Sequence, residues 1–86
     1  MYVYILKLSD NRHYTGMTNN ITRRLNEHEK GQSKSTQRAL PVKLIYLRTA
    51  VDRKTARRIE VKIKRIGASR FLRMKSTVLS EGQLQH

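Results

Sequence analysis

Charged and polar side chains stand at positions where two predicted helices should be apolar. In the stretch NITRRLNEHEKG, the helical spacing that starts at Ile21 selects Arg24 and His28 together with a leucine. A second predicted helix, over residues 53–66, carries Glu60 on its otherwise apolar stripe. Burial of a charge is costly unless the charge is paired or binds a metal. We therefore expect these three polar side chains to share one interior cleft.

A predicted hairpin near the N-terminus can add two phenols to this cleft. Tyr4 and Tyr14 share one face of the hairpin only when paired residue numbers sum to an even value. A three-residue loop, residues 9–11, gives that register, and the sequence lacks the Asn-Gly or Asp-Gly pair typical of two-residue turns. Tyr14 then lies opposite Leu6. Tyr4 lies opposite Gly16, where the missing side chain leaves room for a close backbone approach or a ligand.

A carboxylate, a guanidinium and phenols in one cleft suit the hydrolysis of phosphodiester bonds. A single carboxylate can hold one Mg²⁺ or Mn²⁺, because these ions prefer oxygen ligands and Mg²⁺ keeps several waters. A guanidinium can bind the scissile phosphate through two hydrogen bonds. A free tyrosine has a pKa of about 10, and nearby cations favour the phenolate and lower that value. A phenol beside Arg24 and a metal is therefore a predicted general base.

Each of these residues also has a purely structural interpretation. The two tyrosines could be ordinary aromatic residues of a sheet. Arg24 could pack its stem while its guanidinium reaches water, and His28 could lie at the exposed edge of its helical stripe. Glu60 could pair with Lys64 one helical turn later, and Gly16 could mark a turn or a bulge. The combination of all of them beside a basic surface is what favours a catalytic site.

The charge balance predicts a polyanionic partner. Nineteen Lys and Arg residues against six Asp and Glu residues give a formal net charge of +13 over 86 residues. Inside cells the commonest polyanion is nucleic acid, and a soluble basic protein without such a partner is the alternative. A membrane surface is less favoured, because no segment pairs a large apolar face with a basic face. The residues predicted to contact nucleic acid are Gly16, Arg23, Lys34, Arg38, Arg57, Arg58 and Lys64.

Cysteine usage and the first residues predict a cytoplasmic protein. The sequence contains no cysteine, so disulfides and thiolate metal sites are unavailable, and a reducing intracellular setting fits. The stretch MYVYILKLSD contains no long apolar run, so we expect neither a signal peptide nor a membrane helix. Association with the nucleoid would agree with the basic charge.

The predicted elements form one small α+β domain in the order ββαβαα. They are, in chain order, strands over residues 2–8 and 12–17, a helix over residues 20–30, a strand over 42–49, and helices over 53–66 and 68–75. Asn20 and Asp52 are predicted N-caps of the first two helices, and Gly67 ends the second. The domain is expected to cover residues 1–75, with residues 76–86 as a flexible tail.

The spacing of these residues resembles that of the GIY-YIG nuclease superfamily. The matching positions are Tyr2-Val3-Tyr4, Tyr14-Thr15-Gly16, Arg24, His28 and Glu60. The two motif tyrosines lie ten positions apart, and Arg24 follows the second tyrosine by another ten. The resemblance covers residues 2–72, and YTGMTNNITRRLNEH is its most specific piece. The chain looks similar above all to small stand-alone, single-domain members related to the nuclease domain of the bacterial excinuclease.

The resemblance implies a three-stranded antiparallel sheet flanked by helices and a metal-dependent DNA endonuclease. It implies one divalent metal, Mg²⁺ or Mn²⁺, on Glu60, and DNA, branched or damaged, as the substrate in DNA repair. Tyr4 would be the general base, and Tyr14 would shape the site. Arg24 would bind the phosphate, and His28 would assist Tyr4 or the phosphate.

Several residues depart from the family pattern. Tyr2 replaces the first glycine of the first motif, and Thr15 replaces the isoleucine of the second. Met17 stands where many relatives carry a lysine, and no asparagine follows Asn26, although some members have one after the metal-binding glutamate. These departures concern the positioning of the substrate more than the binding of metal. Two alternatives stay open: a non-catalytic nucleic-acid-binding module on the same fold, and a component that needs a protein partner for activity.

Overall fold

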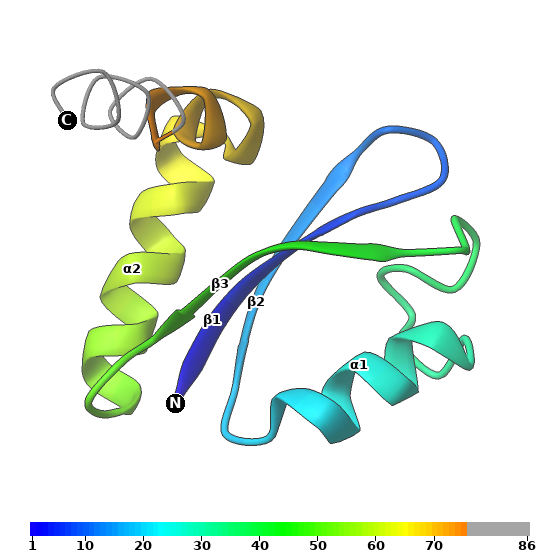
Figure 1. Cartoon of the computed structure of the whole chain (residues 1–86), viewed down its shortest axis with the longest axis horizontal. Coiled ribbons are helices and arrows are strands. Elements are labelled where there is room, and N and C mark those ends of the chain that lie inside the picture. Colours follow the sequence, from blue (N-terminus) through cyan, green and yellow to red (C-terminus); the bar gives the residue numbers. More distant parts are fainter. Residues whose placement is uncertain (76–86) are drawn as a thin grey trace, which may run out of the picture.

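A three-stranded antiparallel sheet forms the centre of the protein, whose computed structural model describes residues 1–75 (Figure 1). The elements are β1 (Tyr2–Lys7), β2 (His13–Thr18), α1 (Ile21–Glu29), β3 (Lys43–Thr49) and α2 (Arg53–Ile66), followed by a helical segment over residues 68–75. The strand order is β2-β1-β3. The predicted α+β fold and the order ββαβαα are confirmed. The predicted tail, residues 76–86, lies outside the described residues.

Helices cover both faces of the sheet. Figure 1 shows α1 and α2 on opposite sides of the three strands. Val3 and Ile5 of β1 pack against Ile63 of α2, whereas Tyr4 and Leu6 belong to a second cluster that includes apolar residues of α1. Successive side chains of a strand point to opposite faces, so the central strand β1 supplies both layers. This alternation explains why four consecutive residues of β1 are buried.

The hairpin between β1 and β2 has the predicted register. Tyr4 pairs with Gly16, and Leu6 pairs with Tyr14. The backbone N–H of Leu8 donates to the carbonyl of Arg12 at 2.9 Å, which closes a loop of three residues. The last loop residue, Asn11, has φ of 71°, a left-handed conformation that asparagine tolerates better than most residues. The three-residue loop therefore puts both tyrosines on the α1 face of the sheet.

The two helices begin at the predicted caps. The Asn20 side chain accepts a hydrogen bond from the Arg23 N–H at 3.0 Å, and the Asp52 side chain accepts one from the Thr55 N–H at 2.8 Å. Gly67 follows α2 with φ of 97°, where a side chain would be strained. Among the described helices, none has both the length and the apolar character needed to cross a membrane.

Candidate active site

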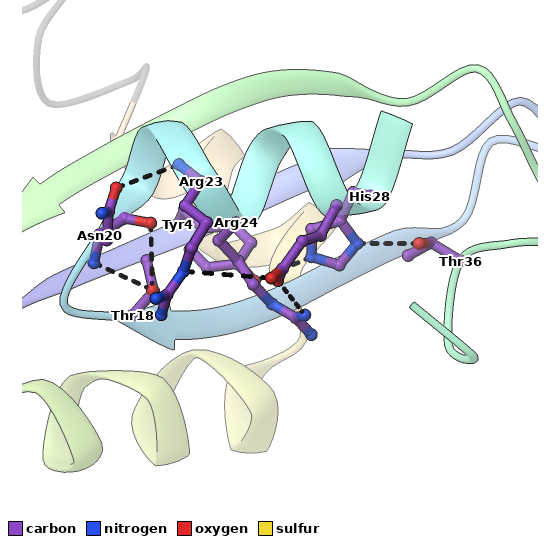
Figure 2. A network of polar contacts seen from close by, with 8 residues as sticks. Tyr4, Thr18, Asn20, Arg23, Arg24, His28 and Thr36 are labelled. Atoms are coloured by element: carbon purple, nitrogen blue, oxygen red, sulfur yellow. Dashed lines mark hydrogen bonds and ion pairs between the residues drawn. The ribbon is translucent and has the colours of Figure 1, made fainter. Parts of the chain in front are cut away.

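A cluster of aromatic and polar side chains lies between α1 and the sheet (Figure 2). Tyr4 and His28 are both fully buried, and the Tyr4 hydroxyl lies 3.0 Å from His28 Nε2 in a hydrogen bond. The Tyr14 ring is centred 5.1 Å from the His28 ring and 6.2 Å from the Tyr4 ring. The structure thus brings together the two motif tyrosines and the histidine of α1. His28 is an interior residue and not a surface residue at the edge of the stripe.

Gly16 permits this close packing. A Cβ atom built at Gly16 would lie 2.6 Å from Tyr4 Oη, 2.7 Å from Tyr4 Cζ and 3.0 Å from Tyr14 Cε2. The room that the sequence indicated beside Tyr4 is therefore filled by the Tyr4 ring. Gly16 itself is buried in β2, and its predicted contact with nucleic acid stays a prediction.

Thr36 extends the cluster on the far side of His28. Its hydroxyl lies 2.8 Å from His28 Nδ1, and Thr36 is fully buried (Figure 2). Thr36 comes from the connection between α1 and β3, which we predicted as a polar loop without a functional residue. No sequence signal distinguishes Thr36 from the neighbouring hydroxyl residues, because its role depends on how the loop folds back over α1.

Arg24 lies on the solvent side of the cluster, with 31% of its side chain exposed. Its Nη1 donates to Glu27 Oε1 at 3.0 Å, one helical turn away. This bond to Glu27 is the main cause that raises the pKa of Arg24, and hydrogen bonds to the hydroxyls of Tyr4 and Tyr14 raise it further. Sequence reasoning missed Glu27, although a helical Arg–Glu pair at spacing i, i+3 is a recognised signal.

The protonation states inside the cluster follow from burial. Burial raises the pKa of Tyr4 to about 12 and outweighs the nearby Arg24 guanidinium, which acts in the opposite direction. The expectation that cations would lower the pKa of this phenol is therefore wrong for Tyr4. Burial also lowers the pKa of His28, and Arg24 lowers it further. At neutral pH the Tyr4 phenol keeps its proton and the His28 imidazole is uncharged.

Glu60 lies on the opposite helix from this cluster. Only 12% of its side chain is exposed, and Oε2 lies 3.5 Å from Lys64 Nζ, so the structural interpretation of an i, i+4 ion pair holds. Glu60 faces a pocket of about 350 Å³, whose lining residues are Met1, Met17, Thr18, Asn19, Arg53, Arg57 and Glu60. This pocket adjoins the C-terminal end of β2 and does not include the tyrosines, Arg24 or His28.

Strand β2 connects the two parts of the site. Lys64, the ion-pair partner of Glu60, lines a second pocket together with His13, Tyr14 and Thr15 of β2. The pocket of Glu60 contains Met17 and Thr18 of the same strand. We expected one shared cleft; instead, four of the predicted catalytic residues form one cluster, and Glu60 lies along β2 in a neighbouring pocket.

The cationic residues predicted to contact nucleic acid are all exposed. They come from three parts of the fold: Arg23 from α1, Lys34 and Arg38 from the connection to β3, and Arg57, Arg58 and Lys64 from α2. Arg57 also lines the pocket of Glu60, so a positive side chain stands beside the acid.

The family follows from comparison with known proteins. Residues 1–71 match the family model of the GIY-YIG catalytic domain. The chain belongs to the GIY-YIG family. This result confirms the resemblance found in the tyrosine motifs, and it supports a nuclease-type function that acts on nucleic acid.

Other GIY-YIG proteins of similar size resemble most of the chain. A UPF0213 protein of Streptococcus agalactiae is 42% identical over 64 residues, which are 73% of each chain. A UPF0213 protein of Clostridium perfringens is 38% identical over 77 residues, covering 88% of this chain and 83% of the relative. The solution structure of a UPF0213 protein from Bacillus halodurans is 31% identical, with a TM-score of 0.52 over 92% of this chain and 81% of that one.

GIY-YIG nucleases generally use a divalent metal, so the fit of the donors matters. Residues 1–75 contain no group of three or more His, Asp or Glu side chains that could hold a metal. Among the described residues that line its pocket, Glu60 is the one carboxylate, with the Thr18 hydroxyl and the Asn19 amide nearby. Such a donor set fits Mg²⁺ only when water and substrate phosphate complete its ligands. The neighbouring arginines would also favour binding together with a phosphate.

Proposed function

We propose that this GIY-YIG protein hydrolyses phosphodiester bonds of DNA with the help of Mg²⁺ or Mn²⁺. The observation that carries the proposal is the hydrogen bond of 3.0 Å between Tyr4 and His28, beneath the Arg24 guanidinium. Burying a phenol, an imidazole and part of a guanidinium together costs free energy that a purely structural core does not need to spend. A catalytic role for the cluster accounts for that cost.

Arg24 is the proposed phosphate ligand. Glu27 accepts from Nη1, which leaves the other donors of the guanidinium for the tyrosine hydroxyls and for a phosphate. A guanidinium held in this way stabilises negative charge that develops on the phosphate oxygens in the transition state. The anchoring by Glu27 also lowers the entropy that Arg24 would lose on binding the substrate.

Tyr14 is the proposed phenol that contacts the attacking water. Its side chain is partly buried, whereas Tyr4 has no exposed surface. In the proposed step the water gives a proton to the Tyr14 phenolate, and its oxygen bonds to phosphorus. The bond from phosphorus to the leaving oxygen breaks, and that oxygen takes a proton from solvent. The role of general base, which the resemblance gave to Tyr4, therefore moves to Tyr14 in this proposal.

Tyr4 supports Tyr14 from inside the fold. Because its pKa is about 12, Tyr4 stays protonated and can donate to the Tyr14 oxygen when that oxygen carries charge. Glu60 would hold the divalent cation, which when bound would neutralise charge on the leaving oxygen. The positive residues around Glu60 would bind the DNA strand that brings the scissile phosphate to this place.

A cleavage panel tests the proposed function. Purified protein is incubated with branched, flapped, nicked, single-stranded and linear DNA, with Mg²⁺, with Mn²⁺ and with EDTA. We expect cleavage of at least one substrate that depends on metal and is lost in Glu60→Ala and Arg24→Ala. Both variants should keep most of the DNA binding, because the remaining cations still contact phosphates.

Lys30→Ala is a matched control for this panel. It removes one positive charge from the end of α1, as Arg24→Ala does from the middle, and should cleave like the wild type. Cleavage that persists in both Glu60→Ala and Arg24→Ala would remove these residues from the mechanism.

A non-catalytic nucleic-acid-binding module is the second candidate. Glu60 is paired with Lys64, and Met17 lines the pocket where many relatives carry a lysine on the same motif. Under this alternative the wild type binds DNA with steep dependence on salt and cleaves no substrate of the panel with either metal.

A further inference from the structure

Thr36 occupies a fixed position beneath His28. Its backbone N–H donates to the Ser33 carbonyl at 3.2 Å, and its own carbonyl accepts from the Ala39 N–H at 2.9 Å. The Ala39 carbonyl in turn accepts from the Ser9 N–H at 2.9 Å, which ties this segment to the β1–β2 loop. The loop between α1 and β3 therefore holds the Thr36 hydroxyl in place against the imidazole.

The direction of the hydrogen bond between Thr36 and His28 can be worked out from the donors and acceptors. A threonine hydroxyl has one hydrogen and two lone pairs. Within residues 1–75, His28 Nδ1 is the partner of the Thr36 oxygen. A buried hydrogen without an acceptor costs more than a vacant lone pair, so the hydroxyl hydrogen belongs on the side of Nδ1.

The other nitrogen of the ring then carries the imidazole hydrogen. His28 is fully buried, and an uncharged imidazole has a single N–H. If Nδ1 accepts from Thr36, Nε2 must donate, and its partner at 3.0 Å is the Tyr4 oxygen. The hydrogen of Tyr4 is then free for Tyr14, whose ring centre lies 6.2 Å from that of Tyr4. The reverse order would leave the Thr36 hydrogen unused.

We propose that Thr36 is a positioning residue whose hydroxyl donates to His28 Nδ1 and fixes the imidazole as the Nε2–H tautomer, a hydrogen-bond donor to Tyr4. His28 therefore does not remove a proton from Tyr4. It holds the Tyr4 oxygen so that the Tyr4 hydrogen points outward. The consequence for cleavage rests on the proposed function, whereas the tautomer itself does not.

The tautomer of His28 is measured by ¹⁵N NMR on uniformly labelled protein at pH 7.5, without DNA or metal. Long-range ¹H–¹⁵N correlation separates a protonated from an unprotonated ring nitrogen. The expected result is a protonated Nε2 and an unprotonated Nδ1 in the wild type and in Thr36→Ser, which keeps the hydroxyl. A protonated Nδ1 in the wild type would overturn the inference, whatever the cleavage panel gives.

The positioning role is measured by cleavage with three variants of one segment. Thr36→Val keeps the shape but removes the hydroxyl, and we expect a fall in kcat of about tenfold, the size of one lost hydrogen bond. Thr36→Ser should recover most of this loss, and Ser35→Ala, an exposed neighbour, should match the wild type. A Thr36→Val protein that is folded and cleaves like the wild type would refute the role. Absence of cleavage in the wild type would refute the proposed function and leave the NMR result to decide the tautomer.

Discussion

The replacement Gly16→Ala tests the packing of the two motif tyrosines directly. The new Cβ would lie 2.7 Å from Tyr4 Cζ. Carbon atoms reach favourable contact at about 3.5 Å, so the ring has to move by roughly 0.8 Å, the difference between the two distances. Tyr4 is fully buried and bonded to His28, so this movement must distort that bond or the pairing of β1 with β2.

The expected loss of stability follows from three contributions. Overpacking costs about 1–3 kcal/mol, and a weakened buried hydrogen bond costs about 1–3 kcal/mol more. Alanine restricts the unfolded chain more than glycine does, which returns about 0.4–1 kcal/mol. We therefore expect the free energy of unfolding to fall by about 2–4 kcal/mol, a large share of the total for a small domain. Urea denaturation followed by circular dichroism measures this change.

A double-mutant cycle separates the tyrosine contact from other effects of the alanine. In a Tyr4→Leu background the atoms that meet the new Cβ are gone, so Gly16→Ala should cost at least about 1 kcal/mol less than in the wild type. An equal cost in both backgrounds, or a cost below about 0.5 kcal/mol in the wild type, would refute the packing argument.

Three further predictions concern α1. Glu27→Ala should lower kcat by about three- to tenfold while DNA binding stays equal or tightens, because the guanidinium loses its anchor and the net charge rises; single-turnover cleavage and binding titrations measure this, with Glu29→Ala as the unchanged control. The free energy of unfolding should fall as the pH drops below 6.5, because the unfolded chain then binds a proton at His28 that burial disfavours in the folded state. Urea titrations at pH 7.5 and 5.5 should show this decrease in the wild type and in His13→Gln but a smaller one in His28→Gln, and equal decreases would contradict the assignment. Asn20→Ala should lower the free energy of unfolding by about 1 kcal/mol through loss of the helix cap, and an unchanged urea midpoint would show that the cap contributes nothing.

The sequence predicts the parts of this fold that local rules control. The length of the β1–β2 loop and the absence of a two-residue turn signal determine the register that places Tyr4 opposite Gly16. Asn20 and Asp52 begin the helices because their side chains accept from backbone N–H groups three residues later. Each of these features depends on a few neighbouring residues, so the pattern contains the information.

Other features of the site depend on contacts between distant segments. Helical periodicity puts Glu60 at the edge of an apolar stripe, but it does not state that α2 covers the opposite face of the sheet from α1. Thr36 reaches His28 only because its loop is bonded to the first hairpin. The raised pKa of Tyr4 has the same origin, since a count of nearby cations ignores burial.

The alternation of β1 links catalysis to folding. Tyr4 faces the polar cluster, while Val3 and Ile5 on either side of it are buried in the apolar layer beneath α2. One stretch of backbone therefore sets both the geometry of the site and the cohesion of the domain. A fluctuation that opens the tyrosine cluster must also disturb the layer under α2, so the site has the rigidity of the most protected strand. Mutations that adjust the activity through β1 will also change the stability of the whole domain.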